Sequence, residues 1–227
     1  MRRTLTLRSL NGEDLATGDQ TQAVIGDQVT SRLVFHFKDG SLHDETTVFT
    51  QGGVFRLVSD HLIQTGKAFP TPLDMSIDRE RGDMLVKYRD GRGQARTSTD
   101  HLTLPGDLAN GFIPTLLKNV LPEDGPVVIS FVAATPQPRL VKLNVRAAGT
   151  ESASVAGQPR PTTHFVIRVE IGGLSGLLAP LVGKQPPDSH MWILQGAAPA
   201  FVKTEAQLYI GGPLWRIEMA SPPVAKD

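Results

Sequence analysis

The sequence contains no cysteine among its 227 residues. This absence excludes disulfide bonds, thiolate zinc sites, iron–sulfur clusters and a thiol nucleophile. An excess of charge of one sign is lacking as well, because 23 Lys and Arg residues balance 23 Asp and Glu residues. A chain with zero formal net charge and no compact block of Lys or Arg has no long-range field to attract nucleic acid. We therefore expect no nucleic-acid partner.

Long apolar runs are also lacking. The longest run, around residues 174–182, holds about nine residues interrupted by Gly and Pro, whereas a membrane-spanning helix needs about 20. Residues 1–10 begin with the positive charge of a secretory leader, but Thr4, Thr6, Arg8 and Ser9 interrupt its apolar stretch. We expect no membrane span and identify no signal peptide. The compartment stays open: periplasm or envelope is favoured if a leader was removed, and cytoplasm otherwise.

Alternation of apolar and polar residues dominates the chain. Leu33, Phe35 and Phe37 alternate with other residues, and the run ends at the hairpin signal Asp39-Gly40. In 54–63 the same pattern places Phe55, Leu57 and Ile63 on one face, with Arg56 and Asp60 on the other. Similar runs cover 42–50, 75–77, 85–88, 94–102, 127–133, 139–147, 164–171, 189–195, 200–210 and 214–220.

One segment has helical periodicity instead. Between 107 and 121 most apolar residues recur at three- and four-residue spacings, and Pro114 favours a start near Ile113. About ten strands with one helix cannot form a parallel doubly wound sheet, because parallel strands need helical crossovers. The fold class that we predict is mainly β: a large curled antiparallel sheet, or half-barrel, with one principal helix in its concave face.

Residues 1–227 are interpreted as a single β-rich domain. The stretch 148–161, rich in Gly, Ala, Ser and Pro, predicts a flexible loop, and the strands between 75 and 102 are polar enough to be expected where the sheet meets water. The predicted core consists of the inward apolar residues of the strands and the helix. They are Phe35, Phe37, Phe55, Leu57, Leu116, Leu117, Val120, Phe131, Val141, Leu143, Phe165, Ile167, Val169, Trp215 and Ile217.

The connection 172–188 is unusually apolar for a link between strands. It is either an apolar lid over the mouth of the sheet or a short cap on the core, and both alternatives place it where an apolar ligand would bind. The candidate ligand-binding residues are Leu174, Leu177, Leu178, Leu181, Val182 and Trp192.

Polar residues offer one candidate cluster for chemistry, namely His164, Glu170 and His190, expected inside the concavity. His36 and His43 flank a hairpin and could join Glu45 in a metal site, but histidines on half-exposed strands are usually polar surface. We therefore predict no metal and no cofactor. A catalytic serine motif is not found, because Leu177 stands where the G-x-S-x-G motif needs its final Gly. Phosphate-binding motifs are not found either, since the Gly-Gly pairs end strands without opening a helix.

Several motifs resemble a family of uncharacterised bacterial proteins. The segments that carry the resemblance are 183–194 (GKQPPDSHMWIL), 198–203 (APAFVK) and 211–218 (GGPLWRIE), with 37–41 and 107–111 in support. The similarity runs from about Leu5 to Ala220 and implies no activity. In the order of its elements the chain resembles, more distantly, envelope proteins of the lipoprotein-carrier architecture, in which an open half-barrel holds a helix around an apolar cavity. That second resemblance implies a binding role without chemistry.

Two functions follow as hypotheses. The first is a non-catalytic binding module for a lipid-like or other apolar ligand in the bacterial envelope. The alternative is a hydrolase or metal-dependent enzyme that uses the polar cluster. An inner face lined by apolar side chains favours the first, and convergent polar side chains favour the second. A filled interior without a ligand remains a third interpretation, and the oligomeric state stays open.

Overall fold

The computed structural model describes residues 1–155, 157–170 and 185–220. These residues form fourteen β-strands, the α-helix α1 (Ile113–Leu117) and the short 3₁₀ helix η1 (Pro122–Asp124). The first eight strands are β1 (Arg2–Ser9), β2 (Asp14–Ile25), β3 (Gln28–Phe37), β4 (Leu42–Thr50), β5 (Arg56–Thr65), β6 (Leu73–Asp78), β7 (Asp83–Arg89) and β8 (Ala95–His101). The other six are β9 (Val127–Ala133), β10 (Arg139–Val155), β11 (Gln158–Glu170), β12 (Ser189–Leu194), β13 (Ala200–Ala206) and β14 (Trp215–Met219).

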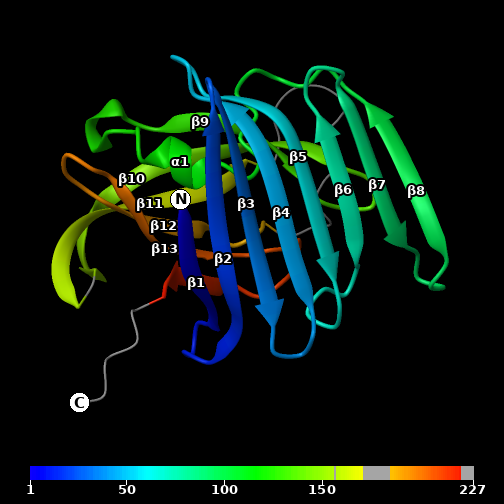
Figure 1. Ribbon diagram of the computed structural model, residues 1–227, viewed down its shortest axis with the longest axis horizontal. Helices are drawn as coiled ribbons and strands as arrows, with labels where there is room; N and C mark the ends of the chain where they lie inside the picture. The colour runs from blue at the N-terminus through cyan, green and yellow to red at the C-terminus, as the bar shows by residue number, and fades with distance from the viewer. Residues whose placement is uncertain (156, 171–184, 221–227) are drawn as a thin grey trace.

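All fourteen described strands belong to one antiparallel sheet of order β8-β7-β6-β5-β4-β3-β2-β1-β14-β13-β12-β11-β10-β9. Strands β1–β8 form a first half and β9–β14 a second half, and pairing of β1 with β14 joins them. In Figure 1 the first half stands in front, and the strands of the second half cross behind it. The sheet is not closed, and β8 and β9 are its edges. The predicted mainly β, curled antiparallel fold is confirmed.

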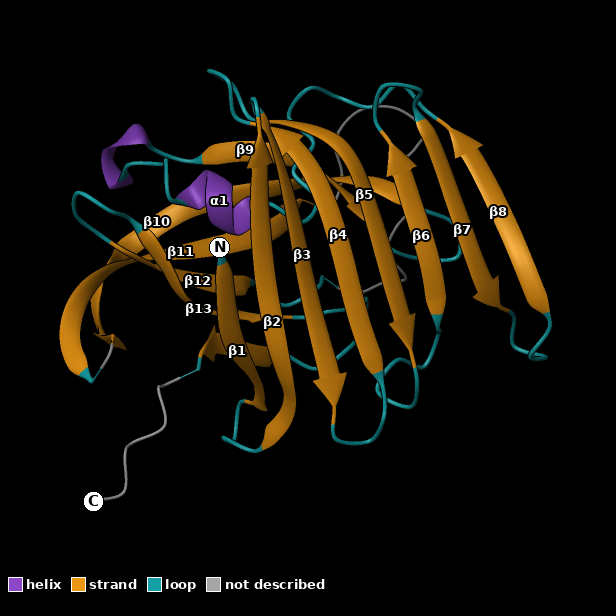
Figure 2. Cartoon of the chain, in the orientation of Figure 1, coloured by secondary structure: helices purple, strands orange, loops and turns teal. Residues whose placement is uncertain are grey.

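The helix is much shorter than predicted. Only 113–117 of the expected segment 107–121 is α-helical, and it lies close to β9 (Figure 2). The preceding residues bond to the edge strand instead: Ala109 N donates to Ser130 O at 3.0 Å, and Ser130 N donates to Asp107 O at 3.1 Å. Their backbone groups are thereby used by β9, so they cannot continue the helix.

The prediction of a loop at 148–161 was wrong. Strands β10 and β11 pair from Lys142 opposite Glu170 to Val155 opposite Gln158, so most of this stretch is an extended hairpin. A register shift near Gly149 lets the hairpin bend without ending. Small residues indicate a loop from composition alone, but a neighbouring strand that satisfies their backbone groups keeps them extended.

Two further expectations need correction. The strands between 75 and 102 do lie at one end of the sheet, where β8 is a largely exposed edge, but their inner face is not polar, because Met75, Ile77, Met84 and Val86 are all buried in the core. Strands β1 and β2 were not predicted, although β1 occupies the centre of the sheet and its Leu side chains are buried. About ten strands were expected where the described residues form fourteen.

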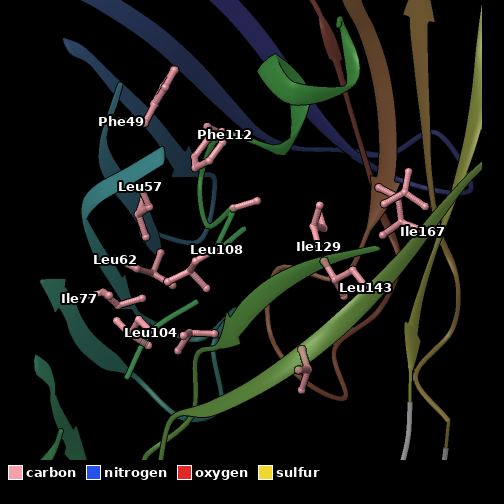
Figure 3. Packing of buried hydrophobic residues seen from close by; sticks show 14 of the residues in the cluster. Phe49, Leu57, Leu62, Ile77, Leu104, Leu108, Phe112, Ile129, Leu143 and Ile167 are labelled. Atoms are coloured by element: carbon pink, nitrogen blue, oxygen red, sulfur yellow. The ribbon is translucent and has the colours of Figure 1, made fainter. Parts of the chain in front are cut away.

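The core lies between the two halves of the sheet. In Figure 3, Leu108 and Phe112 lie between Phe49 and Leu57 of the first half and Ile129 of the second. A second cluster surrounds the junction of β1 and β14. All fifteen predicted core residues are buried or pack against one of these clusters, so that prediction is confirmed.

The Gly211–Glu218 motif has a packing role in the second cluster. The Tyr209 ring lies so close to Gly212 that an added Cβ would come within 2.7 Å of it. Trp215 packs edge-on against Phe69, with 6.2 Å between ring centroids, and contacts Phe37 at 5.4 Å. Part of this motif is therefore explained by the fold itself.

Candidate functional site

An apolar pocket opens between the two halves of the sheet, at the end where β5 and β9 begin. Its volume is about 410 Å³, which lies within the range of small-ligand pockets. Val54 and Val128 at its rim are 60% and 45% exposed, so the pocket communicates with solvent. The lining residues come from the start of β5, the chain before α1, α1 itself and β9. They are Val54, Phe55, Arg56, Gly106, Asp107, Leu108, Phe112, Leu116, Val127, Val128 and Ile129.

Phe112 links the pocket to the core. Its ring stacks on Phe49 with 4.8 Å between centroids and an interplanar angle of 20°, and Phe55 lies beside both rings. The Asn110 side chain fixes this segment on β9, since it accepts from Val132 N at 2.8 Å and donates to Val132 O at 2.9 Å. The pocket wall is thus held by the second half of the sheet and packed on the first.

Gly111 completes the attachment to the first half. Its backbone has a φ of 68°, in the region that favours glycine, and an added Cβ would lie 1.7 Å from Thr47 Oγ1. The same Cβ would lie 3.0 Å from Asp60 Oδ1. Backbone and polar side chains meet here so closely that only glycine fits.

Two carboxyl groups lie on the inner face below this contact. Asp60 is 1% exposed, and its Oδ1 accepts a hydrogen bond from Thr47 Oγ1 at 2.7 Å, while Oδ2 has no partner among the described residues. Burial raises the pKa of Asp60 to about 6. Glu45 keeps part of its surface accessible, yet burial and then the charge of Asp60 raise its pKa well above the usual value. Protonation of either carboxyl group removes the repulsion between the two.

Asp60 was expected on the solvent face, and that expectation was wrong. The register of β4 and β5 shifts at a bulge: Val48 pairs with Ser59, but Phe49 pairs with Leu57, so Val58 is an extra residue. One extra residue reverses the alternation of faces beyond it, and Asp60 therefore points inward like Leu57.

The trio His36, His43 and Glu45 does not form a site. His36 is exposed on the outer face of β3, whereas His43 is buried on the inner face of β4. Burial lowers the pKa of His43 to about 4, and Gln64 Nε2 lies 3.1 Å from His43 Nδ1, which suits a neutral ring that accepts at Nδ1. The described residues contain no group of three or more His, Asp and Glu placed to hold a metal ion.

His164 and His190 do meet, with 2.9 Å between His164 Nε2 and His190 Nδ1. Their partner is Glu151 of β10, whose Oε1 lies 2.7 Å from His164 Nδ1. Trp192 stacks on His164, with 4.5 Å between centroids, and donates to Glu151 Oε2 at 2.7 Å, which lowers the pKa of that carboxyl. Lys203 Nζ lies 4.0 Å from the centre of the Trp192 ring. The result is a hydrogen-bonded chain of one carboxylate and two imidazoles.

This cluster lies on the outer face of the second half, opposite the core, whereas the sequence analysis placed it in the concavity. Phe165 and Met191, at alternate positions of the same strands, are in the core. Glu170 stays apart and accepts a hydrogen bond from Asn144 Nδ2 at 3.1 Å.

Glu151 was missed in the sequence analysis because its segment was interpreted as a loop. The pocket residues were missed because they come from separate segments that share no local motif.

Of the predicted ligand-binding residues, Trp192 belongs to the outer cluster and does not line the pocket. Residues 171–184 lie outside the described residues, so the lid and cap alternatives stay predictions. The candidates in that range are Leu174, Leu177, Leu178, Leu181 and Val182.

Comparison with known proteins gives one informative result. No known protein family matches the chain, and no curated protein matches it. Its fold is similar to that of a β-barrel-like protein of the domain of unknown function DUF1849 from Brucella abortus. The TM-score is 0.52 at 9% sequence identity, over 97% of this chain and 95% of that one. The likeness therefore concerns the fold, which this chain shares with a bacterial protein of unknown function. Among the described residues, no helix is long and apolar enough to cross a membrane.

Proposed function

We propose that this protein is a non-catalytic binding module for a lipid-like or other apolar ligand, held in the pocket between the two halves of the sheet. The observation that carries the proposal is the pocket itself, which is open at its rim and lined mostly by apolar side chains. Each Å² of apolar surface removed from water on binding contributes about 25 cal/mol. An apolar ligand would thus be favoured there over a polar one.

The position of the pocket supports the same function. It lies between the sheet and α1, with Leu116 of the helix and Phe55, which directly precedes β5, on its walls. Its location corresponds to the apolar cavity implied by the pattern-level resemblance to lipoprotein carriers. We extend the proposal to the bacterial envelope, where lipid-like ligands are concentrated, and fractionation of cells that produce the protein tests that location.

The outer cluster supports catalysis less well. Glu151 and His164 orient His190, which is a plausible arrangement for moving a proton. The cluster nevertheless lies on the other face of the sheet from the core and the pocket. Hydrolysis or metal-dependent chemistry at this cluster is therefore the weaker alternative.

The test is titration with N-phenyl-1-naphthylamine, an uncharged apolar fluorophore that brightens in apolar surroundings. We expect saturable binding to the wild type and at least tenfold weaker binding to Leu116→Trp, since the larger side chain fills the pocket. The matched control is Leu121→Trp, because Leu121 follows α1, is exposed and does not line the pocket. Equal binding by both variants, with both folded by urea unfolding, would contradict the proposal. Where the wild type binds the fluorophore, native mass spectrometry of gently purified protein identifies any copurifying lipid.

A further inference from the structure

Two arginine side chains converge beside the pocket, over Gly106. Arg56 begins β5 and lines the pocket, Arg79 follows β6, and Gly106 lies in the chain after β8. A Cβ added to Gly106 would lie 3.2 Å from Arg56 Nη1 and 3.7 Å from Arg79 Nη2. Because both nitrogens lie within 3.7 Å of one point, they are separated by no more than twice that distance.

Neither guanidinium has a protein counter-ion within the described part of the chain, where the ion pairs involve other residues. Arg79 is half-buried, and its Nε is buried without a hydrogen-bond partner among those residues. The carboxylate that lines the pocket, Asp107, is engaged elsewhere: Lys142 Nζ lies 2.9 Å from Oδ2, and Ser130 Oγ donates to Oδ1 at 2.8 Å. Within residues 1–155, 157–170 and 185–220, the two cations therefore have no carboxylate partner.

Such an arrangement favours the binding of an anion. Two neighbouring positive charges repel each other, and a buried donor without an acceptor loses the hydrogen bond it would make to water. Guanidinium groups present forked donors that match the oxygen atoms of carboxylates and phosphates, with N–O distances of about 2.8 Å. An anionic group between Arg56 and Arg79 satisfies both requirements.

We propose that the ligand of the pocket is an anionic amphiphile, with its apolar chain in the pocket and a carboxylate or phosphate head group between Arg56 and Arg79. This inference rests on the proposed function, because the pocket must hold the chain. Arg56 is exposed at the rim and Arg79 is half-buried beside it, so the head group lies at the mouth. The apolar chain then packs along Phe112 and Leu116.

The experiment compares two fluorescent probes that share one apolar chain and differ in the charge of the head group: cis-parinaric acid and its methyl ester. We expect the wild type to bind the acid at least tenfold more tightly than the ester. The double variant Arg56→Gln/Arg79→Gln should lose this preference, so that the acid and the ester bind with similar affinity. The double variant Arg56→Lys/Arg79→Lys, which retains the charge, should keep part of the preference. Arg92→Gln is the matched control, because Arg92 is exposed at the other end of β7 from Arg79.

The outcomes separate the two proposals. Equal binding of acid and ester by the wild type, or an unchanged preference in the Gln double variant, would overturn the head-group inference and leave the apolar pocket standing. Binding of neither probe would contradict the proposed function and this inference together. Competition distinguishes sources of the anion: displacement by dodecyl phosphate but not by inorganic phosphate supports an amphiphile, whereas equal displacement by inorganic phosphate would show a site for free anions and overturn the inference.

Discussion

Replacing Asp60 by Asn should change how the stability of this protein depends on pH. Asn has nearly the same shape as Asp, and its Oδ1 retains the hydrogen bond from Thr47 Oγ1. It cannot ionise, however, so the variant removes the buried charge that the wild type acquires as pH rises. The substitution therefore removes one titrating carboxyl group from the interior of the sheet.

The magnitude follows from the pKa of Asp60, which burial raises from 3.8 to about 6. Between these pH values the folded state keeps a proton that the unfolded state has lost. The wild type therefore loses stability as pH rises from about 4 to about 6, and the loss persists above pH 6. At 1.36 kcal/mol per pKa unit, the loss is about 3 kcal/mol. Removing the charge of Asp60 also lowers the pKa of Glu45, because that charge is one of the causes that raise it.

The assay is urea unfolding of wild type and Asp60→Asn at pH values from 4 to 8. At each pH we subtract the free energy of unfolding of the wild type from that of the variant. Any pH-independent cost of burying the amide cancels when this difference at pH 8 is compared with the difference at pH 4. Because the unfolded carboxyl is already partly ionised at pH 4, we expect the stability of the variant relative to the wild type to be about 2 kcal/mol greater at pH 8 than at pH 4. Asp27→Asn, at the exposed turn between β2 and β3, serves as the matched control. A stability difference that is the same at both pH values would refute the assignment of Asp60 as a buried, titrating carboxyl.

Two further predictions concern stability. Leu117→Ala, at a site 1% exposed, should lower the free energy of unfolding by about 2 to 5 kcal/mol, whereas Leu121→Ala, at a site 56% exposed, should change it by less than about 0.5 kcal/mol in urea titrations. Gly111→Ala should abolish folding or cost more than about 3 kcal/mol because its Cβ would overlap Thr47, while Gly26→Ala, with a similar positive φ but open space around it, should cost only about 1 kcal/mol by thermal melting. Similar losses for the two glycine variants would show that the contact with Thr47 is not tight.

Much of the fold could be predicted because strand alternation is a local signal. Phe35 and Phe37 alternate with exposed residues since one face of their strand is buried, and the same reasoning found Phe165 and Ile167. The prediction was wrong where it rested on amino-acid composition alone, because pairing with a neighbouring strand decides the structure there. The segment that holds Glu151 has the small residues of a loop but lies extended beside β11, and so the carboxylate partner of His164 was missed.

The sequence by itself determined the antiparallel β character of this protein and the buried face of most strands. Period-two alternation requires no knowledge of the neighbouring strand. Only the tertiary structure decided that β1 pairs with β14, that the bulge at Val58 turns Asp60 inward, and that Arg56 and Arg79 meet over Gly106. The physical reason is that alternation fixes the face of a side chain, whereas register, bulges and curvature fix which distant strand ends meet. The pocket and its paired arginines exist only at such a meeting of strand ends.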